Sequence, residues 1–144
     1  MASDSQVVEV SPWVTLIAYF LAQPEISEVF GTQVAGRHKY GDGWAARSLG
    51  LAIKPDSGPA NRYLNLGSGR FEVRIYGDSY FAIDAAYQPI RKNILNFQRT
   101  SIGNALVRII SQETTPIPLD DPDLNSPFYL FFISASVAEE AIPG

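Results

Sequence analysis

The sequence predicts an α+β domain: an antiparallel sheet of about four to five strands, with two helices packed on one face and a long hairpin arm. Two stretches, one after Pro12 and one after Ser79, space their apolar residues as amphipathic helices do. Four others have the alternation or apolar density of strands. With 144 residues the chain is long enough for one compact domain. We expect an N-terminal extension over residues 1–10, the domain over 11–138 and a C-terminal tail over 139–144.

The predicted first helix begins at Ser11 and Pro12, because serine is a good N-cap and proline suits the first helical turn. Gln23-Pro24 interrupts this helix, and a short helical turn then continues to Gly31, a favourable helix stop. The apolar stripe that we expect to be buried consists of Trp13, Leu16, Ile17, Phe20 and Leu21.

The predicted second helix follows Asp78 and Ser79, either of which can cap it. Pro89 lies inside its pattern and should kink or split it. The residues that mark its buried face are Ile83, Ala86, Tyr87, Ile90, Ile94 and Phe97.

The predicted strands lie on either side of this second helix. Before it, strands around Leu51 and over 71–75 form an antiparallel hairpin, and the long polar connection from Lys54 to Arg70 is its arm. Residues 32–40 are a further candidate strand. The segments after the helix are a strand over 106–110, a loop over 114–127 and the last strand over 128–137.

The first half of the last strand is apolar on both faces. One face carries Phe128, Leu130 and Phe132. The other carries Tyr129, Phe131 and Ile133. Such a strand is either central under helices or has its second face covered by another subunit.

Composition excludes several kinds of chemistry. The chain has no cysteine, so disulfides, zinc ribbons, Fe–S clusters and thiol nucleophiles are excluded, and His38 is its one histidine. No apolar run approaches the ~20 residues that span a bilayer, and residues 1–10 lack the basic start of a signal peptide. We expect a soluble protein with no cofactor, no metal and no membrane partner.

One motif has the spacing of a calcium loop. Asp121, Asp123 and Asn125 match the opening of such a loop. Its sixth position should be glycine and its twelfth glutamate, where this chain has Ser126 and Phe132. We therefore expect a solvated loop here and no calcium site.

Two further patterns carry little chemistry. Gly67-Ser68-Gly69 precedes a strand, whereas phosphate-binding glycines follow a strand and open a helix. His38 and Asp42 have no serine nucleophile or second base beside them. The sequence therefore predicts no catalytic residue, and we expect that the protein is not an enzyme.

Charge is uneven along the chain. All eleven Lys and Arg residues lie between Arg37 and Arg108, while residues 1–29 and 112–144 hold four and six acidic residues and no base. Two explanations remain open: the acidic ends fold over the basic middle within one domain, or opposite faces of the subunit carry opposite charge and stack on copies of themselves. The net charge of −4 disfavours a general nucleic-acid binder.

Three arginines, Arg70, Arg74 and Arg91, are candidates for a basic patch. Arg70 and Arg74 share one strand face with Glu72 between them, so we expect a solvated or ion-paired face. The chain shows no basic and aromatic stripe of the RNA-binding type.

The C-terminal third contains a strand, Ala105 to Ser111, followed by the segment TTPIPLDDPDLNSPFYLFFISASV. This part resembles bacteriophage tail completion proteins, also called tail terminators. The resemblance lies in Pro116 to Leu119, in Asp121-Pro122 and in Pro127-Phe128-Tyr129, followed by an alternating strand. The element order over residues 11–137 also resembles that family.

The resemblance implies a structural protein of the virion that forms a ring of six copies on the head-proximal end of the tail tube. Such a ring stops tube polymerisation and provides the docking face for the head. Its expected partners are itself, the major tail tube protein and a head-closure or connector protein, while double-stranded DNA passes through the lumen without specific binding. The expected location is the tail or neck of the virion, and the host cytoplasm during assembly.

We place the expected inter-subunit contacts or ring surface at charged residues and at apolar residues of the last strand. An acidic group at a ring surface or lumen would keep DNA from sticking, since phosphate contacts drive non-specific binding. The residues are Asp120, Asp121, Asp123, Arg62, Arg70, Arg74, Phe131 and Ile133.

Two other functions remain open. The chain fits another phage head-tail connector or head-closure protein, or a non-viral small α+β binding module. A pocket lined by convergent polar groups would favour the binding module. A ring with a lumen wide enough for duplex DNA would favour a phage neck protein.

Overall fold

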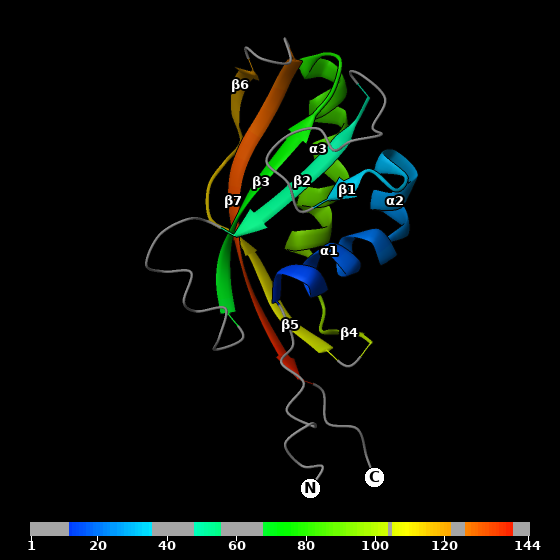
Figure 1. Ribbon diagram of the computed structural model, residues 1–144, viewed down its shortest axis with the longest axis vertical. Coiled ribbons are helices and arrows are strands. Elements are labelled where there is room, and N and C mark those ends of the chain that lie inside the picture. The colour runs from blue at the N-terminus through cyan, green and yellow to red at the C-terminus, as the bar shows by residue number, and fades with distance from the viewer. Residues whose placement is uncertain (1–11, 36–47, 56–67, 104, 122–125, 140–144) are drawn as a thin grey trace, which may run out of the picture.

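The computed structural model describes residues 12–35, 48–55, 68–103, 105–121 and 126–139 (Figure 1). Its elements, in chain order, are α1 (Pro12–Ala22), α2 (Pro24–Phe30), β1 (Val34–Ala35), β2 (Gly50–Pro55), β3 (Ser68–Tyr76), α3 (Tyr80–Leu95), β4 (Thr100–Ile102), β5 (Ala105–Gln112), β6 (Ile117–Asp121) and β7 (Ser126–Glu139). The α+β class is confirmed. Within the described residues the sheet has seven strands and the helix layer three helices, more than the sequence predicted.

The long strand β7 lies at the centre of the sheet (Figure 1). β3 pairs with one edge of β7. On the other edge β6 pairs with the first part of β7 and β5 with the last part, and all three pairings are antiparallel. The strand order is β1-β2-β3-β7-β5-β4, and β1 is parallel to β2. β7 is the central strand, and the helices cover the face that carries Phe131 and Ile133. Phe128 and Phe132 lie on its other face, so coverage of that face by another subunit stays a prediction.

The hydrophobic core lies between the helices and one face of the sheet. Because side chains alternate along a strand, every second residue of β3 and β7 reaches this core. The sheet contributes Phe71, Val73, Ile75, Phe131 and Ile133, all buried, and the helices contribute Leu16, Phe20, Ile26, Ile83 and Ile90.

The helix boundaries agree with the predicted signals. The Ser79 hydroxyl accepts a hydrogen bond from the amide of Ala82 at 3.2 Å, so this residue is the cap. Pro89 lies within α3, and the helix continues past it without being split. On α1, Leu21 is 38% exposed and does not belong to the buried stripe, whereas Tyr19 is buried in the core. Tyr19 packs there against Phe20 and Phe97, which the apolar spacing did not indicate.

Two short strands lie in segments that have no local strand pattern. Residues 114–127 were predicted as a loop, but Ile117–Asp121 form β6, which pairs with the start of β7. Pro118 lies in this strand, and proline is tolerated there because β6 is hydrogen-bonded on one side to β7. Thr100–Ile102 form β4 at the edge of the sheet beside β5.

The hairpin of β2 and β3 is antiparallel, as predicted. Most of its expected arm, residues 56–67, lies outside the described residues. Of the candidate strand over 32–40, Val34–Ala35 form β1, and residues 36–47 are likewise outside the described part. The predicted boundary at residue 10 lies outside the described part as well, while β7 extends to Glu139, one residue past the predicted end of the domain at 138. Both domain boundaries stay predictions.

Gly77 connects β3 to α3 at a tightly packed position. A Cβ atom at this residue would lie 2.9 Å from Cγ1 of Ile83 and 3.1 Å from Cδ2 of Leu49. Ile83 is fully buried, so it has little room to move. We expect Gly77→Ala to lower the free energy of unfolding by about 1–3 kcal/mol through overpacking, measured by urea denaturation. Ala85→Gly, at an exposed position of α3, is a control that also changes one methyl group. It should cost about 1 kcal/mol through helix propensity alone. An unchanged stability in Gly77→Ala would contradict the tight packing at Gly77.

Candidate functional site

The helix-free face of the sheet combines charged and aromatic side chains. On β3 the residues that point to this face include Arg70 and Arg74, and on β7 they include Phe128 and Phe132. The Arg70 guanidinium carbon lies 4.3 Å from the Phe132 ring centroid, and that of Arg74 lies 4.9 Å from the Phe128 ring centroid. Both are within the range of cation–π attraction.

Both arginines of this face are ion-paired. Nε of Arg74 lies 2.8 Å from Oε2 of Glu72, and Nε of Arg70 lies 3.2 Å from Oε1 of Glu113. The expectation of a paired face is therefore confirmed. Arg91 is exposed on α3, in the helix layer, so the three arginines do not form one patch.

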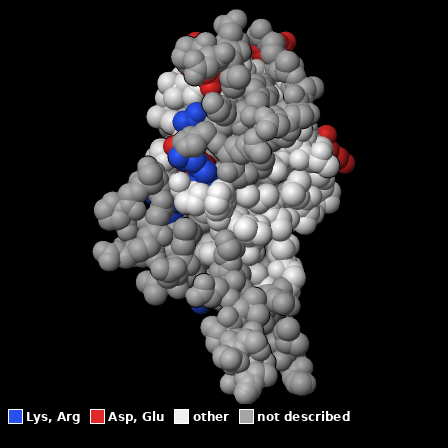
Figure 2. Space-filling model, in the orientation of Figure 1, with Lys and Arg blue, Asp and Glu red and all other residues white. Residues whose placement is uncertain are grey.

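The pair of Arg70 and Glu113 also bears on the uneven charge of the chain. Arg70 comes from the basic middle and Glu113 from the acidic C-terminal segment. The opposite charges of Arg70 and Glu113 therefore pair within one domain. In Figure 2 the basic side chains group near the middle of the visible face, and acidic ones lie mainly toward its upper end and right edge. Stacking of oppositely charged faces on other copies stays a prediction.

Tyr76 is fully buried on the helix-free face, next to Arg74. Burial raises the pKa of its hydroxyl above the ordinary value of 10.0, while the hydrogen bond and charge of Arg74 act in the opposite direction. Above pH 10 the unfolded chain therefore loses this proton while the folded chain keeps it, and folding stability falls.

We expect the free energy of unfolding to decrease from about pH 9 to about pH 11, and to decrease less in Tyr76→Phe. At neutral pH this variant should be about 1 kcal/mol less stable, because it loses the hydrogen bond from Arg74. Urea denaturation at each pH measures both effects. Equal slopes for wild type and Tyr76→Phe would refute the assignment.

The other predicted contact residues lie in different surroundings. Phe131 and Ile133 are buried in the core beneath the helices, so in this subunit they are core residues and not surface residues as expected. Asp120 is exposed at the end of β6 and accepts a hydrogen bond from the Tyr80 hydroxyl at 3.1 Å. Asp121 is partly buried. Arg62 and Asp123 lie outside the described residues.

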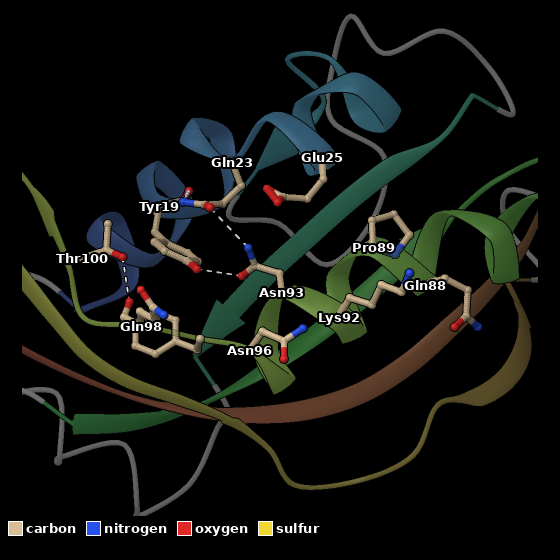
Figure 3. Close-up of a pocket in the computed structure, with 11 residues that line it drawn as sticks. Tyr19, Gln23, Glu25, Gln88, Pro89, Lys92, Asn93, Asn96, Gln98 and Thr100 are labelled. Atoms are coloured by element: carbon tan, nitrogen blue, oxygen red, sulfur yellow. Dashed lines mark hydrogen bonds between the residues drawn. The ribbon is translucent and has the colours of Figure 1, made fainter.

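A cleft of about 640 Å³ opens between α1, α2 and α3 (Figure 3). Its wall includes aromatic and amide side chains, and Glu25 and Lys92 are its charged residues. The Tyr19 hydroxyl donates to Oδ1 of Asn93 at 2.7 Å, and Nδ2 of Asn93 donates to Oε1 of Gln23 at 3.2 Å.

These polar groups bind one another and thereby connect α1 to α3. Nε2 of Gln23 also donates to the Tyr19 carbonyl at 3.3 Å, which completes the network. Burial raises the pKa of the Tyr19 hydroxyl, so it remains protonated at neutral pH and is not a base. Three of the polar groups in the wall are therefore engaged with one another, and Glu25 and Lys92 are the charged groups beside them.

The described residues offer no assembled metal site: no group of three or more His, Asp or Glu side chains among them is placed to hold an ion. Of the calcium-like motif, Asp123 and Asn125 lie outside the described part. Ser126, at the motif's sixth position, is buried and its hydroxyl donates to the Gly77 carbonyl at 3.2 Å. The described helices include none that is long and apolar enough to cross a membrane.

Several large apolar side chains remain exposed. Phe81 is 91% exposed and Leu95 is 66% exposed, and both belong to α3. The apolar spacing of this helix indicated its buried face and not these exposed residues. The others are Val14, Leu21, Tyr80, Ile109, Ile117 and Leu119.

Comparison with solved structures shows a similarity of fold. No family model matches the sequence, and a search of characterised proteins found no match. Among solved structures, the fold is similar to that of a chain from the virion of a native gene transfer agent particle, with a TM-score of 0.59. The match covers 95% of this chain and 98% of the other, at 11% sequence identity. The two chains therefore share a fold over nearly their whole lengths.

Proposed function

We propose that this protein is a structural component of a phage-like virion. The observation that carries the proposal is the similarity in fold, over nearly the whole of both chains, to a chain of a gene transfer agent virion. A match that spans both chains end to end favours a similar role more than a match to one shared motif would. The proposed role needs neither a catalytic group nor a cofactor.

Within this class, we propose that the chain is a tail terminator that forms a ring, six copies in all, on the head-proximal end of the tail tube. The segment from Pro116 to Tyr129, which resembles tail completion proteins, supports this finer assignment. The partners would be the tail tube protein and a head-closure or connector protein, in the neck of the virion. The exposed carboxylate of Asp120 is available for the ring surface or the lumen, where acidic groups would let DNA pass without binding.

Light scattering combined with negative-stain microscopy of the purified chain tests the proposal. The expected result is a closed ring with a central hole and six times the subunit mass of 15.8 kDa, either alone or after addition of purified tail tubes. A ring that binds tube ends and stops their growth supports the terminator. A ring that binds the head connector and not the tube indicates a head-closure protein. A chain that stays monomeric with both partners overturns the virion proposal.

A further inference from the structure

The surface of α3 that faces away from the sheet is a continuous stripe of exposed residues. Their spacing of three and four positions places them on one side of the helix. The stripe, called here the α3 stripe, consists of Phe81, Asp84, Ala85, Gln88, Arg91, Lys92 and Leu95, and each of these residues is exposed. Its two ends are the strongly exposed apolar side chains, Phe81 and Leu95. These two side chains are 14 positions apart and do not form one contiguous apolar patch, so the residues between them decide what this surface can bind.

The order of residues in the α3 stripe is complementary to itself about Gln88. Phe81 and Leu95 stand seven positions before and after Gln88, and both are large and apolar. Asp84 and Lys92 stand four positions before and after it, and they carry opposite charges.

Two identical helices that cross antiparallel on a two-fold axis bring together residues at equal distances from the axis. An axis at Gln88 would therefore place each Phe81 against the Leu95 of the second copy, and each Asp84 against its Lys92. Such a contact is isologous, and each pair occurs twice.

We propose that the α3 stripe binds the α3 stripe of a second copy of this chain, antiparallel about a two-fold axis at Gln88. Ala85 and Gln88 near the axis leave room for an interaxial distance of about 8–10 Å. Phe81 and Leu95 are 14 positions apart on this helix, so the paired groups extend over about 21 Å. A single helix pair is small beside a standard interface, so the association is reversible and depends on concentration.

The neighbouring groups are compatible with this arrangement. Asp84 accepts a hydrogen bond from the Tyr129 hydroxyl at 3.3 Å, which leaves its second carboxylate oxygen for Lys92 of the second copy. Arg91 stands three positions after Gln88, opposite Ala85, so it meets no like charge there. Among the described residues neither Arg91 nor Lys92 forms a salt bridge within the subunit.

This contact goes beyond the proposed ring. Neighbours in a closed ring of six meet through two different surfaces, whereas the α3 stripe meets itself. A two-fold contact therefore joins two free subunits, or joins two rings face to face. If the two-fold contact does not form, ring formation can still be observed. If the ring does not form, dimerisation of free subunits can still be measured.

A charge exchange tests the proposal by sedimentation velocity of the full chain from about 1 μM to about 1 mM. The wild type should dimerise reversibly. Asp84→Lys and Lys92→Asp each place like charges together at two symmetric positions, and each should weaken dimerisation about tenfold or more. The double variant Asp84→Lys/Lys92→Asp exchanges the charges and should restore dimerisation to within about threefold of wild type. Glu28→Lys, an equal charge change at an exposed residue of α2, is the control and should dimerise as the wild type does.

Phe81→Ser provides a second test, because it removes an apolar contact without burying or exposing anything in the folded subunit. Circular dichroism should show an unchanged fold, and dimerisation should be lost. If the purified chain forms rings, the wild type should give stacked pairs of rings and the variants single rings. A wild type that remains monomeric, or single rings that never pair, or a double variant no tighter than the single ones, would overturn the proposal.

Discussion

Phe131→Ala is expected to lower the free energy of unfolding by about 3–5 kcal/mol, the usual cost of removing a buried phenyl ring. Phe131 is fully buried on the central strand β7 beneath the helices. Its ring packs edge-to-face against Tyr87 of α3, with 5.4 Å between the ring centroids. The cavity left by the ring would be surrounded by a sheet and a helix that are held by other contacts, so it cannot close easily.

Phe81→Ala is the matched control, since it makes the same substitution at a residue that is 91% exposed. Its expected effect is within about 0.5 kcal/mol of wild type. Urea denaturation followed by tryptophan fluorescence and circular dichroism measures both variants. If Phe131 lay on an inter-subunit surface, as the sequence first indicated, the two variants would unfold alike in the isolated subunit.

Elements with a strong local pattern were predicted well. The periodic spacing after Pro12 and Ser79 indicated α1, α2 and α3, and the alternation around Leu51 and Val73 indicated β2 and β3. In each case the residues that define the pattern lie within one element, so the pattern survives in the folded chain.

The strands β4 and β6 could not be predicted in this way, because their partners define them. β6 contains Pro118 and two aspartates, all unfavourable in strands, yet the edge of β7 binds it. Pairing between distant segments is not encoded in local composition. The loop prediction for residues 114–127 was therefore wrong at 117–121, which form β6, and at 126–127, where β7 begins.

The error on Phe131 has a different cause. Alternation along β7 separates two sets of side chains but does not say which set lies under the helices. The register decides it: Phe131 is opposite Val73, on the apolar side of β3, while Leu130 is opposite Arg74. If the pairing of β7 with β3 had been known, the polar face of β3 would have shown which face of β7 lies away from the helices.

The features of the candidate site also differ in whether they depend on local sequence or on contacts between distant segments. The ion pair of Arg74 was predictable, because Glu72 lies two residues away on the same strand face. The partner of Arg70 was not, because Glu113 comes from a distant segment. The cleft between α1 and α3 was not, because it depends on how two helices pack. The α3 stripe is readable from the sequence alone, once the exposed face of the helix is examined with the same care as its buried face.

The second large effect concerns Arg74, whose guanidinium lies between Glu72, Tyr76 and the Phe128 ring on the helix-free face. We expect Arg74→Met to lower the free energy of unfolding by about 2–4 kcal/mol. The aliphatic part of the side chain is preserved, so the loss comes from the charge. The Glu72 side chain is only 13% exposed, and without Arg74 its carboxylate loses a charge-assisted hydrogen bond of 2.8 Å.

The double variant Glu72→Gln/Arg74→Met distinguishes two contributions to this loss. One is the stabilisation that the Glu72–Arg74 pair provides, and the other is the cost of keeping the Glu72 charge when Arg74 is removed. If the cost dominates, the double variant should be about 1–2 kcal/mol more stable than Arg74→Met alone, because the amide of glutamine is cheaper to bury than a carboxylate. Urea denaturation of wild type, both single variants and the double variant gives this coupling. Additive losses would show instead that Arg74 acts through its contacts with Phe128 and Tyr76, independently of Glu72.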